Sequence, residues 1–189
     1  TGLGMAWVQS NQQGMQAYDT EGGHIDFAPV NEQQIQLLEF LSKRFEHVSY
    51  ERILSGQGMA ALYAFCSGKQ DSTINAAWVN GHANEDQAAS NALILFTEIY
   101  GAYIGNIAVL FKPSNGIYIT GGIAAKILQY MQSDAFKNAY LNKGRMRTLV
   151  EKIAVYLVTN ERIGVLGAMS ETIKYCRNQD GQEKFKITG

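Results

Sequence analysis

Hydrophobic residues along this chain follow two periods, and their order predicts an α/β domain. Short apolar stretches with β-branched or aromatic residues predict strands at 5–9, 15–19, 116–120 and 153–158, the first two as a hairpin. Apolar residues spaced three and four apart predict helices at 31–46, 59–66, 74–79, 85–111, 123–131, 135–141, 145–150 and 165–177. Strands alternating with helices in this order predict a mixed sheet flanked by helices.

The longest periodic stretch, 85–111, is expected to be the central helix of the core. Its apolar face would carry Ala88, Ala92, Leu95, Ile99, Tyr103, Ile107 and Leu110. The uniformly apolar strand 153–158 is expected inside a sheet. Helix 31–46 would bury Ile35, Leu38, Leu41 and Phe45. Gly56 and Gly58 are expected to interrupt the chain before helix 59–66.

Composition narrows the classes of function. The 189 residues carry a net charge of −1, which argues against a nucleic-acid-binding surface, and no run of eighteen apolar residues predicts a membrane span. Cys66 and Cys176 lie far apart, without metal-ligand spacing, so we expect free thiols in a reducing cytoplasm and no protein-ligated metal.

The first residues, Thr1-Gly2-Leu3-Gly4, form a glycine-rich turn that opens directly into an apolar strand. Such a turn usually has a strand in front of it, and there is no initial Met. We therefore expect that residue 1 is not the natural start of the protein.

Glu21 and His24 are separated by two glycines that allow the backbone to bend sharply and approach a ligand. A carboxylate and an imidazole on such a turn suit neighbouring hydroxyl groups, as in a sugar. A tight turn with two solvated polar residues explains the same letters. Glu51 is likewise either a solvated helix start or a residue that closes a polar pocket with Glu21 and His24.

A second glycine pair, Gly121-Gly122, lies between a predicted strand and a predicted helix N-terminus. Free N–H groups and the helix dipole favour anionic or polar ligands there. Neither this turn nor the one at residues 1–4 matches a P-loop or a GxGxxG turn. Each is a structural turn or part of a ligand site.

Together, five blocks resemble the bacterial glucokinase family, the ATP-dependent enzymes that lack the zinc-binding cysteine motif of the repressor-related sugar kinases. The blocks are TGLG at 1–4, EGGHIDFAP at 21–29, VSYERILSG at 48–56, ITGGI at 119–123 and GVLGA at 164–168. The resemblance implies an actin-like, ribonuclease-H-like ATPase fold. Residues 1–177 would be the larger, C-terminal domain, 178–189 a polar tail, and the N-terminal domain would be absent.

The resemblance also implies roles for individual residues. Glucose would bind Glu21, His24 and Glu51. The ATP phosphates would face Thr1 and Gly2, and the adenosine would lie against Gly121 and Gly122. The activity implied is transfer of a phosphoryl group from Mg²⁺-ATP to glucose, giving glucose 6-phosphate at the entry to glycolysis.

No residue here matches the family's general-base Asp or its first phosphate turn, both expected upstream, so we expect the 189 residues alone to be inactive. Gln57 stands where the family usually has Pro, which affects local rigidity rather than a ligand. The alternatives are a related hexose kinase with another sugar, a non-catalytic sugar-binding module, or a purely structural domain. The family often forms homodimers, and exposed helices of this domain would make the contact.

Overall fold

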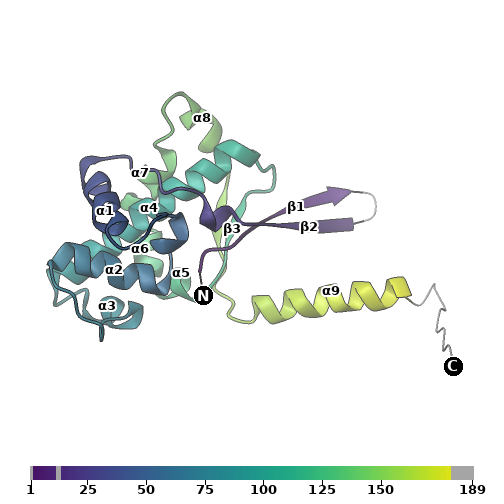
Figure 1. Cartoon of the computed structure of the whole chain (residues 1–189). Helices are drawn as coiled ribbons and strands as arrows, with labels where there is room; N and C mark the ends of the chain where they lie inside the picture. The colour runs from purple at the N-terminus through teal and green to yellow at the C-terminus, as the bar shows by residue number, and fades with distance from the viewer. Residues whose placement is uncertain (1, 12–13, 180–189) are drawn as a thin grey trace.

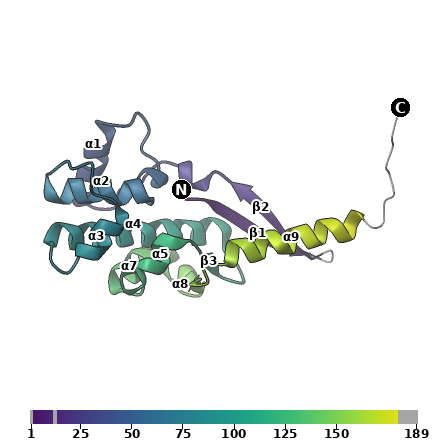
Figure 2. The ribbon, with the colours of Figure 1, turned by 90° about the horizontal axis from the view of Figure 1, so that it is seen from below.

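A helical body with two extensions makes up the chain. The structure, a computed structural model, describes residues 2–11 and 14–179. The body surrounds α4 (Gln87–Phe111), while the hairpin of β1 (Met5–Asn11) and β2 (Gly14–Thr20) and the helix α9 (Ile163–Gln179) project from it in one direction (Figure 1). Figure 2 shows α9 running along the hairpin, and the Lys174 Nζ lies 3.5 Å from the Met15 carbonyl oxygen.

The strands confirm the α/β class but not the single mixed sheet predicted from the sequence. β1 and β2 pair antiparallel from Met5↔Thr20 to Asn11↔Gly14. β3 (Ile117–Ile119) and β4 (Val155–Leu157) pair in parallel as a separate ladder within the described residues. The prediction that β4 lies inside a sheet is wrong for this ladder, because β3 is its only partner there and Tyr156 is exposed. An apolar run does not report how many neighbours a strand has.

The remaining elements are short. The α-helices are α1 (Glu32–Ser42), α2 (Gly56–Ser67), α3 (Ala76–His82), α5 (Gly122–Lys126), α6 (Leu128–Met131), α7 (Asp134–Leu141) and α8 (Arg147–Val150). The 3₁₀ turns are η1 (Gly22–His24), η2 (Tyr50–Arg52) and η3 (Gly144–Met146). Helix predictions at 31–46, 123–131 and 145–150 therefore identified helical regions whose ends or continuity differ.

Side-chain caps explain where several helices begin. The Asn31 side chain accepts a hydrogen bond from the Gln34 N–H, and Asp86 accepts from the first N–H groups of α4. Ser55 accepts from the Gly58 N–H, so α2 starts at Gly56. The expected break at the two glycines is therefore wrong: they form the first turn of α2.

The buried face of α1 differs from the predicted one. Gln34, Leu37 and Leu41 are buried, whereas Ile35 is exposed. The Gln34 Oε1 accepts a hydrogen bond of 3.1 Å from the Val30 N–H, and this bond allows a polar residue to be buried. A hydrophobic pattern could not show that exchange.

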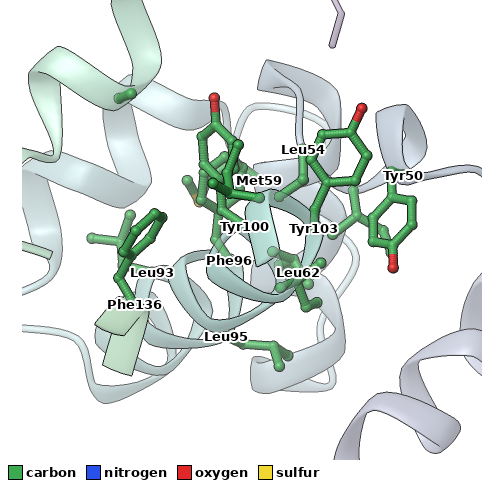
Figure 3. Close-up of a cluster of buried hydrophobic side chains, with 14 of the residues drawn as sticks. Tyr50, Leu54, Met59, Leu62, Leu93, Leu95, Phe96, Tyr100, Tyr103 and Phe136 are labelled. Atoms are coloured by element: carbon green, nitrogen blue, oxygen red, sulfur yellow. The ribbon is translucent and has the colours of Figure 1, made fainter. Parts of the chain in front are cut away.

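α4 is the central core helix, as predicted, and packs against α2 and α7 (Figure 3). By length and composition it could cross a membrane, but 67% of its most apolar window is buried within the protein, as befits the core helix of a globular domain. Gly101 allows close packing, because a Cβ there would overlap the Phe136 carbonyl of α7. Leu110, predicted on the buried face, is 68% exposed at the end of the helix.

Large apolar side chains are exposed on the two extensions. On the hairpin, Trp7 stacks on Tyr18 with ring centroids 4.3 Å apart, and Met15 is exposed. On α9 the exposed residues include Val165 and Leu166. α9 continues to Gln179, so its last two residues belong to the predicted tail; residues 180–189 lie outside the described residues.

The two cysteines should differ in reactivity. Burial raises the pKa of the half-buried Cys66 thiol to about 11, whereas Cys176 is exposed. A raised pKa leaves less thiolate at pH 8, and the thiolate is the nucleophile. We expect a chromogenic disulfide reagent to titrate one thiol quickly in the folded chain and two in denaturant. The fast phase should therefore disappear in Cys176→Ser and remain in Cys66→Ser. The reverse result would contradict the prediction.

Candidate functional site

The site begins with the tight turn η1, which has no room for a side chain at its centre. The His24 N–H donates to the Glu21 carbonyl at 2.9 Å, closing the turn. A Cβ on Gly23 would overlap the Leu3 carbonyl oxygen, and one on Gly22 would lie 2.7 Å from the Met5 Cε. Gly23 is therefore required by the close approach of the segment that leads into β1, whereas the flexible Met5 side chain could move away from a Cβ on Gly22.

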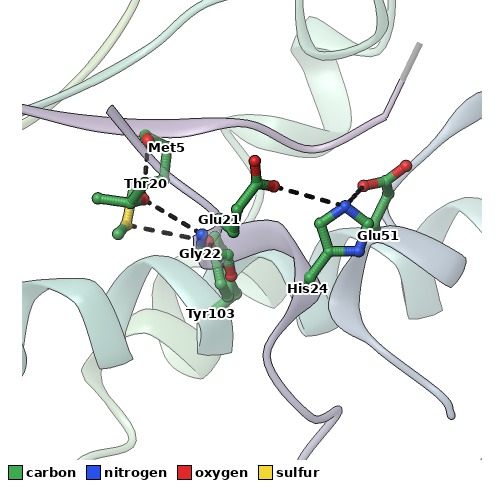
Figure 4. Close-up of polar contacts among 7 residues, drawn as sticks. All are labelled: Met5, Thr20, Glu21, Gly22, His24, Glu51 and Tyr103. Carbon is green, nitrogen blue, oxygen red and sulfur yellow. Dashed lines mark hydrogen bonds and ion pairs between the residues drawn. The ribbon is translucent and has the colours of Figure 1, made fainter. Parts of the chain in front are cut away.

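A hydrogen bond from the central helix α4 holds this turn in place. The Tyr103 hydroxyl on α4 donates to the Gly22 carbonyl at 3.0 Å, and burial raises its pKa to about 12, so it stays protonated as a donor. The Thr20 hydroxyl donates to the Met5 carbonyl at 2.8 Å and accepts from the Gly22 N–H at 3.2 Å (Figure 4). The turn is thus attached to both the central helix and the hairpin.

A pair of backbone hydrogen bonds brings Glu51 to the same place. The Phe27 N–H donates to the Val48 carbonyl at 2.9 Å, and the Tyr50 N–H donates to the Ile25 carbonyl at 3.1 Å. These bonds tie the segment after η1 to the segment that enters η2. Glu21 and Glu51, thirty positions apart in sequence, therefore lie on adjacent turns.

The imidazole of His24 lies between the two carboxylates (Figure 4). Its Nε2 is 3.0 Å from Oε2 of Glu51 and 3.6 Å from Oε2 of Glu21. The side chain of Glu21 is 90% exposed, that of His24 58% and that of Glu51 32%. The structure therefore joins the three polar residues that the sequence left as either a pocket or two solvated turns. Carboxylate acceptors flank a ring that can donate and accept, a set suited to adjacent hydroxyls.

Beside this cluster lies a cavity of about 780 Å³, and three of the residues predicted to bind a ligand line it. They are Gly2, Glu51 and Gly122, from the first turn, from η2 and from the start of α5. Gly2 packs against Glu51 so closely that a Cβ would overlap the carboxylate. Gly121, next to Gly122, has φ +117°, a conformation that favours glycine. Thr1 lies outside the described residues.

Part of the cavity lining comes from a segment to which sequence patterns assigned no role. Asn75 and Asn80 of α3 line it, together with Lys126 at the end of α5. The Asn80 Nδ2 donates to the Lys126 carbonyl at 3.4 Å, across 46 positions of sequence. Asn75 and Asn80 had no role assigned from the sequence, because nothing local connects α3 with α5. Gln57 also lines the cavity, at the first turn of α2.

Within residues 2–11 and 14–179, no group of three or more His, Cys, Asp or Glu side chains is arranged to hold a metal ion. The carboxylates of Glu21 and Glu51 are instead grouped around one imidazole. The cavity lining therefore combines one acidic side chain with amides, an ammonium group and glycine backbone.

Comparison with known proteins gives one consistent result. The family model described as Glucokinase matches residues 1–174. Glucokinase of Nostoc punctiforme is 35% identical over 195 residues, covering 89% of this chain and 57% of that protein. Glucokinase of Photorhabdus laumondii subsp. laumondii is 38% identical over 173 residues, covering 89% and 54%. The chain thus spans about half the length of the curated relatives it matches.

Solved structures agree with the sequence comparison. The crystal structure of glucokinase from an Antarctic psychrotroph superimposes with a TM-score of 0.83 at 30% identity, covering 92% of this chain and 56% of that one. Balamuthia mandrillaris glucokinase, solved in complex with glucose, gives a TM-score of 0.73 at 21% identity, covering 83% and 47%. The second likeness, at this identity, concerns the fold.

Proposed function

The chain belongs to the glucokinase family, and from this premise we propose that it provides the glucose- and nucleotide-binding parts of an ATP-dependent glucokinase. The whole enzyme would transfer a phosphoryl group to glucose and form glucose 6-phosphate, the first step of glycolysis. One observation carries the proposal: Glu51 joins the His24 cluster and also lines the cavity that Gly2 and Gly122 share.

In this proposal Glu21, His24 and Glu51 bind the sugar hydroxyls. Hydrogen bonds to a charged carboxylate are stronger than those between neutral groups. Glu51, which is less exposed than Glu21, has the better protected oxygens and would contribute more to binding. The rigid attachment of η1 to Tyr103 supports this role, because a pre-organised site loses less entropy when the sugar binds.

The nucleotide would occupy the glycine-lined part of the cavity. The ATP phosphates would face Gly2 and Thr1, and the adenosine would lie against Gly121 and Gly122, where a missing Cβ permits close approach. Mg²⁺ would neutralise charge on the phosphate oxygens when ATP is bound. The described residues offer no acidic cluster for the ion, so we propose no protein ligand for it in this chain.

Phosphoryl transfer depends mainly on positioning and on electrostatic stabilisation. The sequence contains no match to the family's general-base Asp. We therefore expect the 189-residue chain to bind glucose and ATP but to show negligible turnover. Chemical shifts in NMR titrations would report binding, and a coupled assay for glucose 6-phosphate would report turnover. Turnover close to that of a whole glucokinase would contradict the inactivity, and absence of both binding events would contradict the proposed site.

Two alternative functions predict different results in related experiments. A hexose kinase with a different sugar would show a stronger response to another hexose in the same titration. A non-catalytic sugar-binding module would bind sugar but lack the general-base Asp in any companion segment.

We also propose that the protein is located in the cytoplasm. We further propose that it forms a homodimer through exposed helices of this domain, which sedimentation equilibrium would detect.

A further inference from the structure

A second cavity lies apart from the residues of the proposed sugar and nucleotide site. It has a volume of about 540 Å³ and is bounded by the start of α1, the middle of α4, α7 and the start of α8. Cavities of roughly 300–1,000 Å³ are typical of small-molecule sites. None of its lining residues lines the first cavity.

Two opposite charges face this cavity without neutralising each other. Glu98 of α4 and Arg147 of α8 both line it, yet no ion pair within 4.0 Å joins them, or joins either to another described residue. Burial raises the pKa of the Glu98 carboxyl, so its charged form lacks part of its hydration and would gain from a cationic partner.

A buried amide adds a directional group. Gln34 is 99% buried, and its Oε1 accepts from the Val30 N–H at 3.1 Å. Its Nε2 donates to no acceptor in the described part of the chain, although it belongs to a residue that lines the cavity. Asn138 and Asn142 of the α7 segment supply further amides. Among the described residues no buried side-chain nitrogen or oxygen lacks a partner, so the Gln34 Nε2 is open to solvent and free to donate to a ligand oxygen.

We propose that this cavity binds a small zwitterion, a free L-α-amino acid, with its ammonium group at Glu98 and its carboxylate at Arg147 and the Gln34 amide. Such a ligand matches both unpaired charges at once. A simple anion would be repelled by the carboxylate of Glu98, and a simple cation would be repelled by the guanidinium of Arg147. A guanidinium presents parallel N–H groups that fit a carboxylate. The proposal does not depend on sugar or nucleotide binding.

The test is an NMR titration of the full 189-residue chain with the standard L-α-amino acids, one at a time, beginning with L-alanine. We expect at least one to shift the amide resonances of α7 and α8 with a Kd of about 1 mM or tighter. Propionate, which lacks the ammonium group, and ethylamine, which lacks the carboxylate, should each bind at least about tenfold more weakly, because each satisfies one charge.

Substitutions then test the contribution of each charged side chain to binding separately. Glu98→Gln and Arg147→Gln should each weaken amino-acid binding at least about tenfold. Glu151→Gln and Arg145→Gln, exposed residues outside the lining, serve as matched controls and should leave it unchanged. Binding of no amino acid, equal binding of propionate, or equal binding by the Glu98 and Arg147 variants would each overturn the proposal. Glucose binding at the first site would be measured on the same samples and is expected to be unaffected.

Discussion

Replacing Gly23 by alanine should lower the free energy of unfolding by about 3 kcal/mol, the upper end of the usual range for overpacking. The added Cβ would overlap the Leu3 carbonyl oxygen, which is backbone and cannot turn aside. Relief requires η1 to move away from the segment that enters β1. That movement would also strain the 3.0 Å bond from Tyr103 to the neighbouring Gly22 carbonyl. Urea unfolding followed by circular dichroism measures the change.

A second glycine provides the control. Gly81 lies inside α3 with open space where a Cβ would be, so Gly81→Ala should be neutral or should stabilise the chain by up to about 1 kcal/mol through helix propensity. If Gly23→Ala unfolded at the same urea concentration as Gly81→Ala, the packing of η1 against the first turn would be disproved. Gly23→Ala should also weaken glucose binding, since His24 belongs to the displaced turn.

Sequence patterns located most of the helices because those signals are local. The period of apolar residues located α4, and the helix predicted over 31–46 contains α1. The errors concern partners rather than elements. The burial of Gln34 depends on one bond to Val30, and the exposure of Tyr156 depends on which strands lie beside β4. Neither fact is encoded in the spacing of apolar residues.

The candidate site shows the same division. Glu21 and His24 were visible because a glycine pair separates them, and resemblance connected them with Glu51. The physical link between the two acids is the backbone pairing beside η1 and η2, which no pattern in the letters specifies. Asn80 was assigned no role for a related reason, since its contact with Lys126 arises only when α3 and α5 pack around the same cavity.

Glu51→Gln should weaken glucose binding about tenfold while leaving ATP binding nearly unchanged. The substitution keeps the shape of the side chain but replaces a charged acceptor by a neutral one, and a hydrogen bond to a charged group contributes about 1.5 kcal/mol or more. Glu51 holds the imidazole of His24 at 3.0 Å and also lines the cavity, so both the hydroxyl contacts and the orientation of the ring would suffer. Separate NMR titrations with glucose and with ATP measure the two affinities.

Comparison of the two acids makes this test specific. Glu21→Gln should also weaken glucose binding far more than ATP binding, but less than Glu51→Gln does, because Glu21 is 90% exposed and lies 3.6 Å from the His24 ring. Glu39→Gln, an exposed change on α1, removes the same charge away from the site and controls for net charge. Unchanged glucose affinity in both site variants would return η1 and η2 to the role of structural turns. Equal losses for glucose and ATP would instead place Glu51 at the boundary between the two ligands, where its contact with Gly2 already brings it close to the proposed phosphate turn.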